Sequence, residues 1–479
     1  MSTVIPPLSS GAERPLSRAL FGRALLPVAY AVAGGLLLLL RVLEPTRLPM
    51  FLDEATNISW GLRALQAEAV ADLFDSLDEG KAPLVPWLLV PGLALSDDRF
   101  LAARLTLAIV GLANGLLLAR IAHRLAGWRV ALVALALYAI SPQTLFYDRI
   151  VLQDSVVLAT SLLTLAFTLH WSAKPTLARA ALLGVAMGLG LLTKLNAVLF
   201  MAAAPVVAWS LLPRQQWARL AQFGLSYLLA LALFSVLLVD PRFSDMLSGK
   251  NTGYWLSVAE IARFPVATWW SNASVYLLHA PATYLTPPVL ALGLLGGALC
   301  LAKRTEGAAL VPWIGLPLLA LVLVVRQQYT RYELFAVAPL LVLAAMAGVW
   351  LLDATAERLR AWRAGRRGLL AGRLALAMGA GLTLLPSAQF DAALIFDPDR
   401  APLATVGISD RGQYIESWSA GHGLAEAAAI ILAEAQVRPV LVYTWTALGI
   451  SDWAHVTFAG RPNIYVGHLH PEEPIAKTV

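Results

Sequence analysis

The sequence has little charge and almost no cysteine. Charged residues make up 14% and hydrophobic residues 58% of the 479 residues, and the mean hydropathy is +0.68. A soluble domain is about one-quarter charged, so this composition excludes a soluble enzyme and predicts a polytopic membrane protein. The single cysteine, Cys300, excludes an intramolecular disulfide and a multi-cysteine metal site. His279 and His422 are isolated and form no metal-ligand pattern.

Other features that the sequence lacks exclude further classes of protein. The net charge of +6 is small and scattered along the chain, so no nucleic-acid partner is expected. We find no internal repeat of the kind that many transporters carry. No small-residue cleavage site follows the apolar run from Ala24 to Leu40, so this run is expected to be a retained first span and not a signal peptide.

Long apolar segments recur along most of the chain. A membrane-spanning helix needs roughly 20 apolar residues. The candidate spans are about 24–43, 101–119, 129–147, 154–172, 180–193, 195–212, 220–239, 286–302, 308–325, 333–352 and 369–386. They predict an all-α polytopic membrane bundle of about eleven transmembrane helices. Segment 83–95, "PLVPWLLVPGLAL", is short and proline-rich, and is expected to lie at the interface.

Basic residues are concentrated in alternate loops, which predicts the topology. The cytoplasmic set comprises Arg14, Arg18, Arg23, Arg120, Arg124, Arg129, Lys174, Arg179, Arg214, Arg219, Lys303, Arg304, and the arginines of 358–373. The outer set comprises the acidic loop 44–100, turns 148–154, 193–195 and 326–332, loop 240–285, and the tail after 387. The N-terminus is therefore expected in the cytoplasm. Richness in Ala, Leu and Arg favours a bacterial plasma (inner) membrane.

The last ninety or so residues differ from the rest. A glycine-bounded helix is expected at about 424–436, followed by the apolar β-rich run "RPVLVYTW". We therefore expect a transmembrane catalytic domain at 1–386, with outer interfacial helices in 44–100 and 240–285. A small extracytoplasmic α/β domain is expected at 387–479.

Ionisable residues gather on the predicted outer face, where they are costly at membrane depth. Four cations could hold a phosphate and three carboxylates could act as a base or as orienting groups. This combination at a membrane surface fits a lipid-phosphate substrate. The cations are Lys81, Arg149, Lys194 and Arg331, and the carboxylates are Asp53, Glu54 and Asp154.

Five short motifs contain these residues. They are the pair Asp53-Glu54, the stretch "GKAPLVPWLL" with Lys81, the R-x-x-x-x-D element from Arg149 to Asp154, the turn "GLGLLTK" ending at Lys194, and the pair Arg331-Tyr332. In this order they resemble the GT-C glycosyltransferases of the protein O-mannosyltransferase and aminoarabinose transferase group (glycosyltransferase family 39-like). The resemblance covers about residues 24–352. Ala82 stands where the family has a proline after the lysine.

The resemblance implies a polyprenyl-phosphate-linked sugar as donor. Asp53 resembles the general base that deprotonates an acceptor hydroxyl, which then attacks the anomeric carbon with inversion. The four cations and Tyr332 would bind the donor phosphate, and Glu54 and Asp154 would orient these groups or the sugar. The scheme needs no cofactor or metal. Mannose is the default sugar by family association, while the acceptor stays open among protein, lipid and glycan.

Each motif also has a structural interpretation. Asp53 and Glu54 could cap a helix at 55–66. Arg149 and Asp154 could be a snorkelling pair at the end of a span, and Lys194 could be a buried counter-ion to Asp154. Tyr332, like Trp269 and Trp270, could be an interfacial anchor. The alternative function is a polytopic transporter or lipid flippase with a polar outer-face site.

Overall fold

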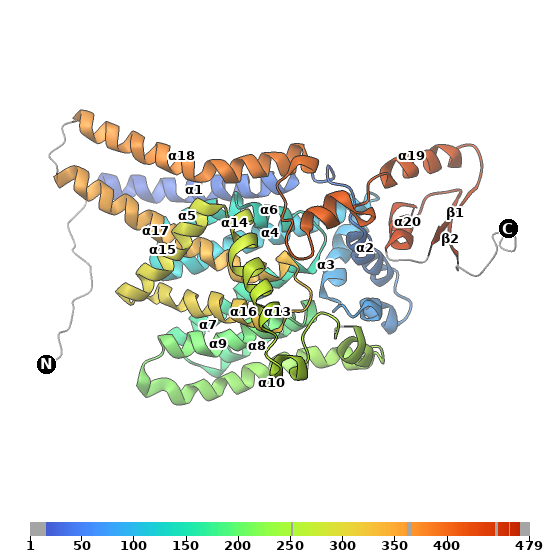
Figure 1. The fold of residues 1–479 in the computed structure, drawn as a ribbon, viewed down its shortest axis with the longest axis horizontal. Coiled ribbons are helices and arrows are strands. Elements are labelled where there is room, and N and C mark those ends of the chain that lie inside the picture. The colour runs from blue at the N-terminus through green and yellow to red at the C-terminus, as the bar shows by residue number, and fades with distance from the viewer. Residues whose placement is uncertain (1–15, 251, 362–365, 446–448, 459, 470–479) are drawn as a thin grey trace.

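The computed structural model describes residues 16–250, 252–361, 366–445, 449–458 and 460–469. Arg14 and the segment "PIAKTV" lie outside these ranges. The chain forms a bundle of apolar helices, and the elements α19 (Leu424–Ala435), α20 (Ile450–Phe458), β1 (Val440–Trp445) and β2 (Ile464–Leu469) gather at one end of it (Figure 1). This arrangement confirms the expected helical membrane bundle with a small C-terminal α/β unit.

Every apolar segment predicted as a span is largely helical. The helices are α1 (Leu16–Val42), α4 (Arg99–Ala126), α5 (Trp128–Ala139), α6 (Pro142–Tyr147), α7 (Gln153–Ala173), α8 (Leu177–Thr193), α9 (Ala197–Leu211), α10 (Phe223–Phe234), α15 (Pro287–Lys303), α16 (Leu310–Val324), α17 (Leu334–Ala361) and α18 (Arg366–Phe396). Within the described residues, six helices are long and apolar enough to cross a membrane alone, and one bent pair could form a seventh span. Several others are shorter apolar helices, so the number eleven stays a prediction.

Three of the expected boundaries differ from the structure. Segment 129–147 is not one helix, because α5 ends at Ala139 and α6 begins at Pro142, whose ring cannot continue a helix but suits its first turn. Helix α18 continues to Phe396, so the expected domain boundary at 386–387 falls inside it. The basic loop expected at 358–373 is shorter, since α17 reaches Ala361 and α18 starts at Arg366.

The C-terminal unit contains a two-stranded parallel sheet in which Val440 of β1 pairs with Ile464 of β2. Its helix α20 packs on α2 (Leu52–Leu65), and a buried apolar cluster joins α2, α3 (Leu84–Leu95), α4 and α20. Gly449 lies against this contact at φ +82, where an added Cβ would stand 2.8 Å from the Cβ of Leu52. Only glycine adopts such a conformation readily. The contact fixes α2 between the bundle and the C-terminal unit.

Candidate functional site

Helix α2 places the acidic pair at its first turn. Leu52 is the first helical residue, and the extended residue Phe51 precedes it. The backbone N–H of Phe51 donates to the Glu54 carboxylate at 3.0 Å. This bond satisfies an N–H at the start of the helix, and negative charge there is favourable. Glu54 therefore caps the helix, as its structural interpretation predicted, whereas Asp53 lies inside the first turn and is not the N-cap residue.

The remaining contacts of Glu54 are also internal. Arg104 of α4 donates to its two carboxylate oxygens at 3.0 and 2.6 Å, and the N–H of Val151 donates at 2.8 Å. Both side chains of the ion pair are buried. Arg104 further donates to the carbonyl oxygens of Pro45, Leu48 and Pro49. Glu54 was predicted to orient the cations or the sugar, but it does not line the Asp53 cavity, and its contacts anchor α2 to α4 and to the connection between α6 and α7.

Asp53, the neighbouring carboxylate, faces a different space. It lines a cavity of ≈ 250 Å³ together with four of the other predicted residues: Lys81, Lys194, Arg331 and Tyr332. These five residues come from α2, the segment before α3, the α8–α9 connection and the turn before α17. A larger cavity of ≈ 510 Å³ beside α19 and α20 contains none of the predicted site residues.

Asp53 lies among positive charges. Its carboxylate is 4.0 Å from the ammonium of Lys81, and Lys81 also lies over the ring of Trp60 at 5.3 Å. Burial alone would raise the pKa of Asp53, but Lys81, Arg331 and Lys194 together hold that pKa below its ordinary value. Asp53 is therefore ionised at neutral pH and able to accept a hydrogen bond from a hydroxyl.

Asp154 is not among the residues that line the cavity, but it is paired with two of the cations that do. Its carboxylate accepts a hydrogen bond from Lys194 at 2.9 Å and lies 3.8 Å from Nε of Arg331. The ammonium of Lys194 also sits 4.7 Å from the ring centre of Tyr332. Asp154 is thus the counter-ion that keeps two cations at the cavity, so the structural interpretation of the Lys194–Asp154 pair is confirmed. Such a pairing remains compatible with binding a phosphate.

Arg149 lies elsewhere, which corrects the prediction that it binds the donor phosphate. Its guanidinium donates to the carbonyl oxygens of Leu40 at 2.7 Å, Leu43 at 2.7 Å and Glu44 at 2.8 Å. These are carbonyl groups at and just beyond the end of α1, which an arginine commonly satisfies. Arg149 is not among the residues that line the cavity. It ties the end of α1 to the start of α7.

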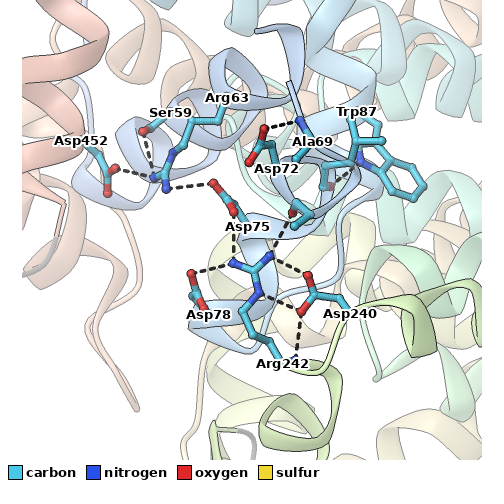
Figure 2. A network of polar contacts seen from close by, with 12 residues as sticks. Ser59, Arg63, Ala69, Asp72, Asp75, Asp78, Trp87, Asp240, Arg242 and Asp452 are labelled. Atoms are coloured by element: carbon cyan, nitrogen blue, oxygen red, sulfur yellow. Dashed lines mark hydrogen bonds and ion pairs between the residues drawn. The ribbon is translucent and has the colours of Figure 1, made fainter. Parts of the chain in front are cut away.

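Two segments outside the long apolar helices also contribute residues to the cavity. The segment after the 3-10 helix η1 (Val70–Glu79) supplies Lys81, and loop 240–285 supplies Tyr254 and Trp255. Arg242 joins these loops, because its guanidinium contacts carboxylates from both: Asp75 and Asp78 at 3.1 Å, and Asp240 at 2.7 Å. Asp75 also binds Arg63 of α2, which reaches Asp452 of α20 (Figure 2). This network fixes the position of Lys81 relative to α2.

Several aromatic residues at the site belong to none of the five sequence motifs. Tyr329 lies under the guanidinium of Arg331 at 4.2 Å, and Trp255 stacks on Tyr332 with ring centres 6.2 Å apart. Tyr414 accepts a hydrogen bond from Arg331 at 2.9 Å. Tyr329 stands two residues before Arg331, in "QQYTRYELF", so its position next to a motif indicates a site residue. Trp255 and Tyr414 come from distant segments that carry no local pattern.

Tyr414 is held in place by a buried anchor. The carboxylate of Asp410 accepts hydrogen bonds from Tyr147 at 3.0 Å and from Tyr284 and Thr330. Asp410 and Tyr414 belong to the segment that follows α18. This part of the C-terminal region therefore reaches into the bundle and supports one wall of the cavity.

The chain is similar to a family of known proteins and to several solved structures. Residues 80–239 match the family model described as dolichyl-phosphate-mannose-protein mannosyltransferase. The apo structure of ArnT from Cupriavidus metallidurans aligns with a TM-score of 0.60 and 14% identity, over 95% of this chain and 87% of that chain. ArnT bound to undecaprenyl phosphate aligns with a TM-score of 0.56 and 17% identity, over 94% of this chain and 86% of that chain.

An oligosaccharyltransferase is also similar. The apo enzyme from Archaeoglobus fulgidus aligns with a TM-score of 0.55 and 14% identity over 77% of this chain, and the chain spans 56% of that enzyme's length. No curated protein sequence matches the chain significantly. At these identities the solved structures establish the fold alone. Together with the family model they confirm the resemblance: the chain is a multi-pass membrane protein with the fold of the GT-C glycosyltransferases.

Proposed function

We propose that this protein transfers a sugar from a polyprenyl-phosphate donor to an acceptor hydroxyl on the extracytoplasmic face, with inversion at the anomeric carbon. The observation that carries this proposal is the cavity in which Asp53 faces Lys81, Lys194 and Arg331. A carboxylate close to three cations suits a reaction in which a hydroxyl loses its proton while a phosphate leaves. The bound undecaprenyl phosphate of the similar ArnT structure supports the donor class.

In the proposed reaction, Asp53 accepts the proton of the acceptor hydroxyl as its oxygen attacks the anomeric carbon. The bond from that carbon to the phosphate oxygen breaks, and the lipid phosphate leaves with the bonding electrons. Negative charge on the leaving phosphate increases along this path, so Lys81, Lys194 and Arg331 stabilise the transition state more than the ground state. Asp154 holds two of these cations at the cavity.

The same cations connect donor binding to the strength of the base. In the free protein they lower the pKa of Asp53, which makes it a weak base. A donor phosphate between them would offset their charge, so the pKa of Asp53 should rise towards a value better suited to general base catalysis. The base would then reach its full strength only when the donor is in place.

Incubation of the purified protein with a labelled polyprenyl-phosphate sugar and cell-envelope extract tests the proposal. We expect label to move from lipid to an acceptor with wild type and not with Asp53→Asn, while both proteins bind the donor. Transfer by Asp53→Asn at the wild-type rate would remove Asp53 from the role of base. Movement of intact donor across a vesicle membrane, without transfer, would instead indicate the flippase alternative.

We also propose that the membrane is the bacterial plasma membrane, with the cavity and the C-terminal unit on its outer side. The alternation of basic and acidic loops supports this orientation. The donor sugar and the acceptor class stay open, with mannose as the default sugar because of the family model.

A further inference from the structure

A second charged cavity lies at the other end of the bundle. It is a groove of ≈ 260 Å³ between α4 and α7, and its lining includes Arg120, Arg124, Phe167 and His170. Gln153 at the start of α7 lines the Asp53 cavity, and His170 stands 17 positions later on the same helix. At 1.5 Å per residue the two are about 26 Å apart. This distance is close to the ~30 Å hydrocarbon core of a bilayer, so the groove opens near the opposite membrane surface.

The groove has an unbalanced positive charge. Arg120 and Arg124 lie one turn apart on α4, where like charges repel each other. Arg124 is paired with Glu306 at 2.6 Å. For Arg120 we find no ion pair or hydrogen bond among the described residues. Because Arg120 is exposed and lines the groove, its guanidinium is available to an anion that enters from outside.

The other walls of the groove are apolar. They are formed by Ile121 of α4 and by a stripe on α7 that comprises Ala166, Phe167, Leu169 and Ala173. The apolar residues Ala166 and Phe167 lie nearer the middle of α7, whereas His170 lies nearer its end. A free anion would leave this apolar surface uncovered. A ligand with an anionic head and a hydrocarbon tail would contact both parts.

We propose that this groove binds an anionic phospholipid. The phosphate group lies between Arg120 and Arg124, where a guanidinium can donate two hydrogen bonds to phosphate oxygens, and an acyl chain follows Ile121 and Phe167. Basic pockets between membrane helices commonly hold anionic head groups. The inference does not rest on the proposed transferase activity, because no residue of the groove lines the Asp53 cavity.

Native mass spectrometry of the full chain in a neutral detergent tests this proposal. We expect phosphatidylglycerol to remain bound at collision energies that remove phosphatidylcholine. Arg120→Gln should weaken phosphatidylglycerol binding about fivefold, the effect of about one cation near an anionic surface, and Arg120→Lys should retain most of it. Equal retention of the two lipids by wild type would overturn the proposal.

Arg129→Gln is the matched control. Arg129 lies at the same end of the bundle, is exposed to a similar extent as Arg124 (46% against 42%) and pairs with Asp353 outside the groove. Arg129→Gln should bind phosphatidylglycerol as wild type does. If Arg120→Gln and Arg129→Gln lose the same amount of binding, then general surface charge holds the lipid and the groove does not. Inorganic phosphate at millimolar concentration should not displace the lipid. Complete displacement would identify a simple phosphate site and refute the lipid assignment.

Discussion

The substitution Glu54→Gln tests whether Glu54 has a structural role that differs from the role of its sequence neighbour Asp53. Glu54 is fully buried and accepts hydrogen bonds from Arg104, from the N–H of Phe51 and from the N–H of Val151. The substitution preserves shape but removes the negative charge, and it leaves the buried guanidinium of Arg104 without its counter-ion. Breaking a buried ion pair by removal of one partner destabilises a protein by about 3–5 kcal/mol. We expect the free energy of unfolding to fall by about 3 kcal/mol, since the amide oxygen still accepts some of these bonds.

The assay is unfolding of the detergent-solubilised protein by denaturant, followed by tryptophan fluorescence, beside a sugar-transfer assay at a temperature where the variant is folded. Asp78→Asn serves as a control, because Asp78 is 56% exposed and its contact with Arg242 should contribute at most about 1 kcal/mol. Asp53→Asn should show the opposite behaviour to Glu54→Gln: a stability close to that of wild type and no transfer.

One result would refute this reasoning. If Glu54→Gln unfolds at the same denaturant concentration as wild type but transfers no sugar, then Glu54 takes part in the chemistry, and its contacts with Arg104 do not anchor α2. A loss of stability with transfer restored under stabilising conditions would agree with the anchoring role.

Three further predictions concern the cavity. Lys194→Ala should weaken donor binding by about tenfold or more, since a hydrogen bond to a charged group contributes about 1.5–3 kcal/mol; unchanged affinity in a donor titration would remove Lys194 from the phosphate site. Tyr414→Phe deletes the acceptor of the Arg331 hydrogen bond. It should raise the KM for donor about fivefold to tenfold, with kcat little changed. A fall in kcat alone would contradict a role of Tyr414 in positioning Arg331. In pH–rate profiles, activity should fall as Asp53 is protonated, so the acid limb of kcat/KM should lie below about pH 3.9, the ordinary pKa of Asp. The acid limb of kcat should lie at higher pH because bound donor offsets the cations, and a kcat limb at the same or lower pH would contradict this coupling.

Local sequence patterns were sufficient to predict the helices and most of the cavity. An apolar run long enough to cross a bilayer must satisfy its backbone hydrogen bonds internally, so it forms a helix whatever its neighbours are. Asp53, Lys81, Lys194 and Arg331 were found because ionisable residues at the ends of such runs are costly unless they have a partner or a function. The concentration of basic residues in alternate loops then predicted that they lie on one face of the membrane.

Local patterns could not distinguish charges that face the cavity from charges that anchor the fold. Glu54 and Arg149 look like site residues by type and position, yet each uses its hydrogen-bonding groups on internal partners. Arg104, the partner of Glu54, lies near the start of the long apolar helix α4 and belongs to none of the five motifs. Successive residues of a helix point about 100° apart, so Asp53 and Glu54 necessarily face different surroundings.

The sequence by itself determined that this protein is a helical membrane bundle with ionisable residues at the ends of its apolar segments, because hydrophobicity and charge placement act locally along the chain. Only the tertiary structure decided which carboxylate lines the cavity, which arginine is bound to backbone carbonyl groups, and that Tyr414 from the C-terminal region accepts a hydrogen bond from Arg331. The physical reason is that a buried charge must find a counter-charge or hydrogen-bond partner. Those partners come from segments far apart in the chain.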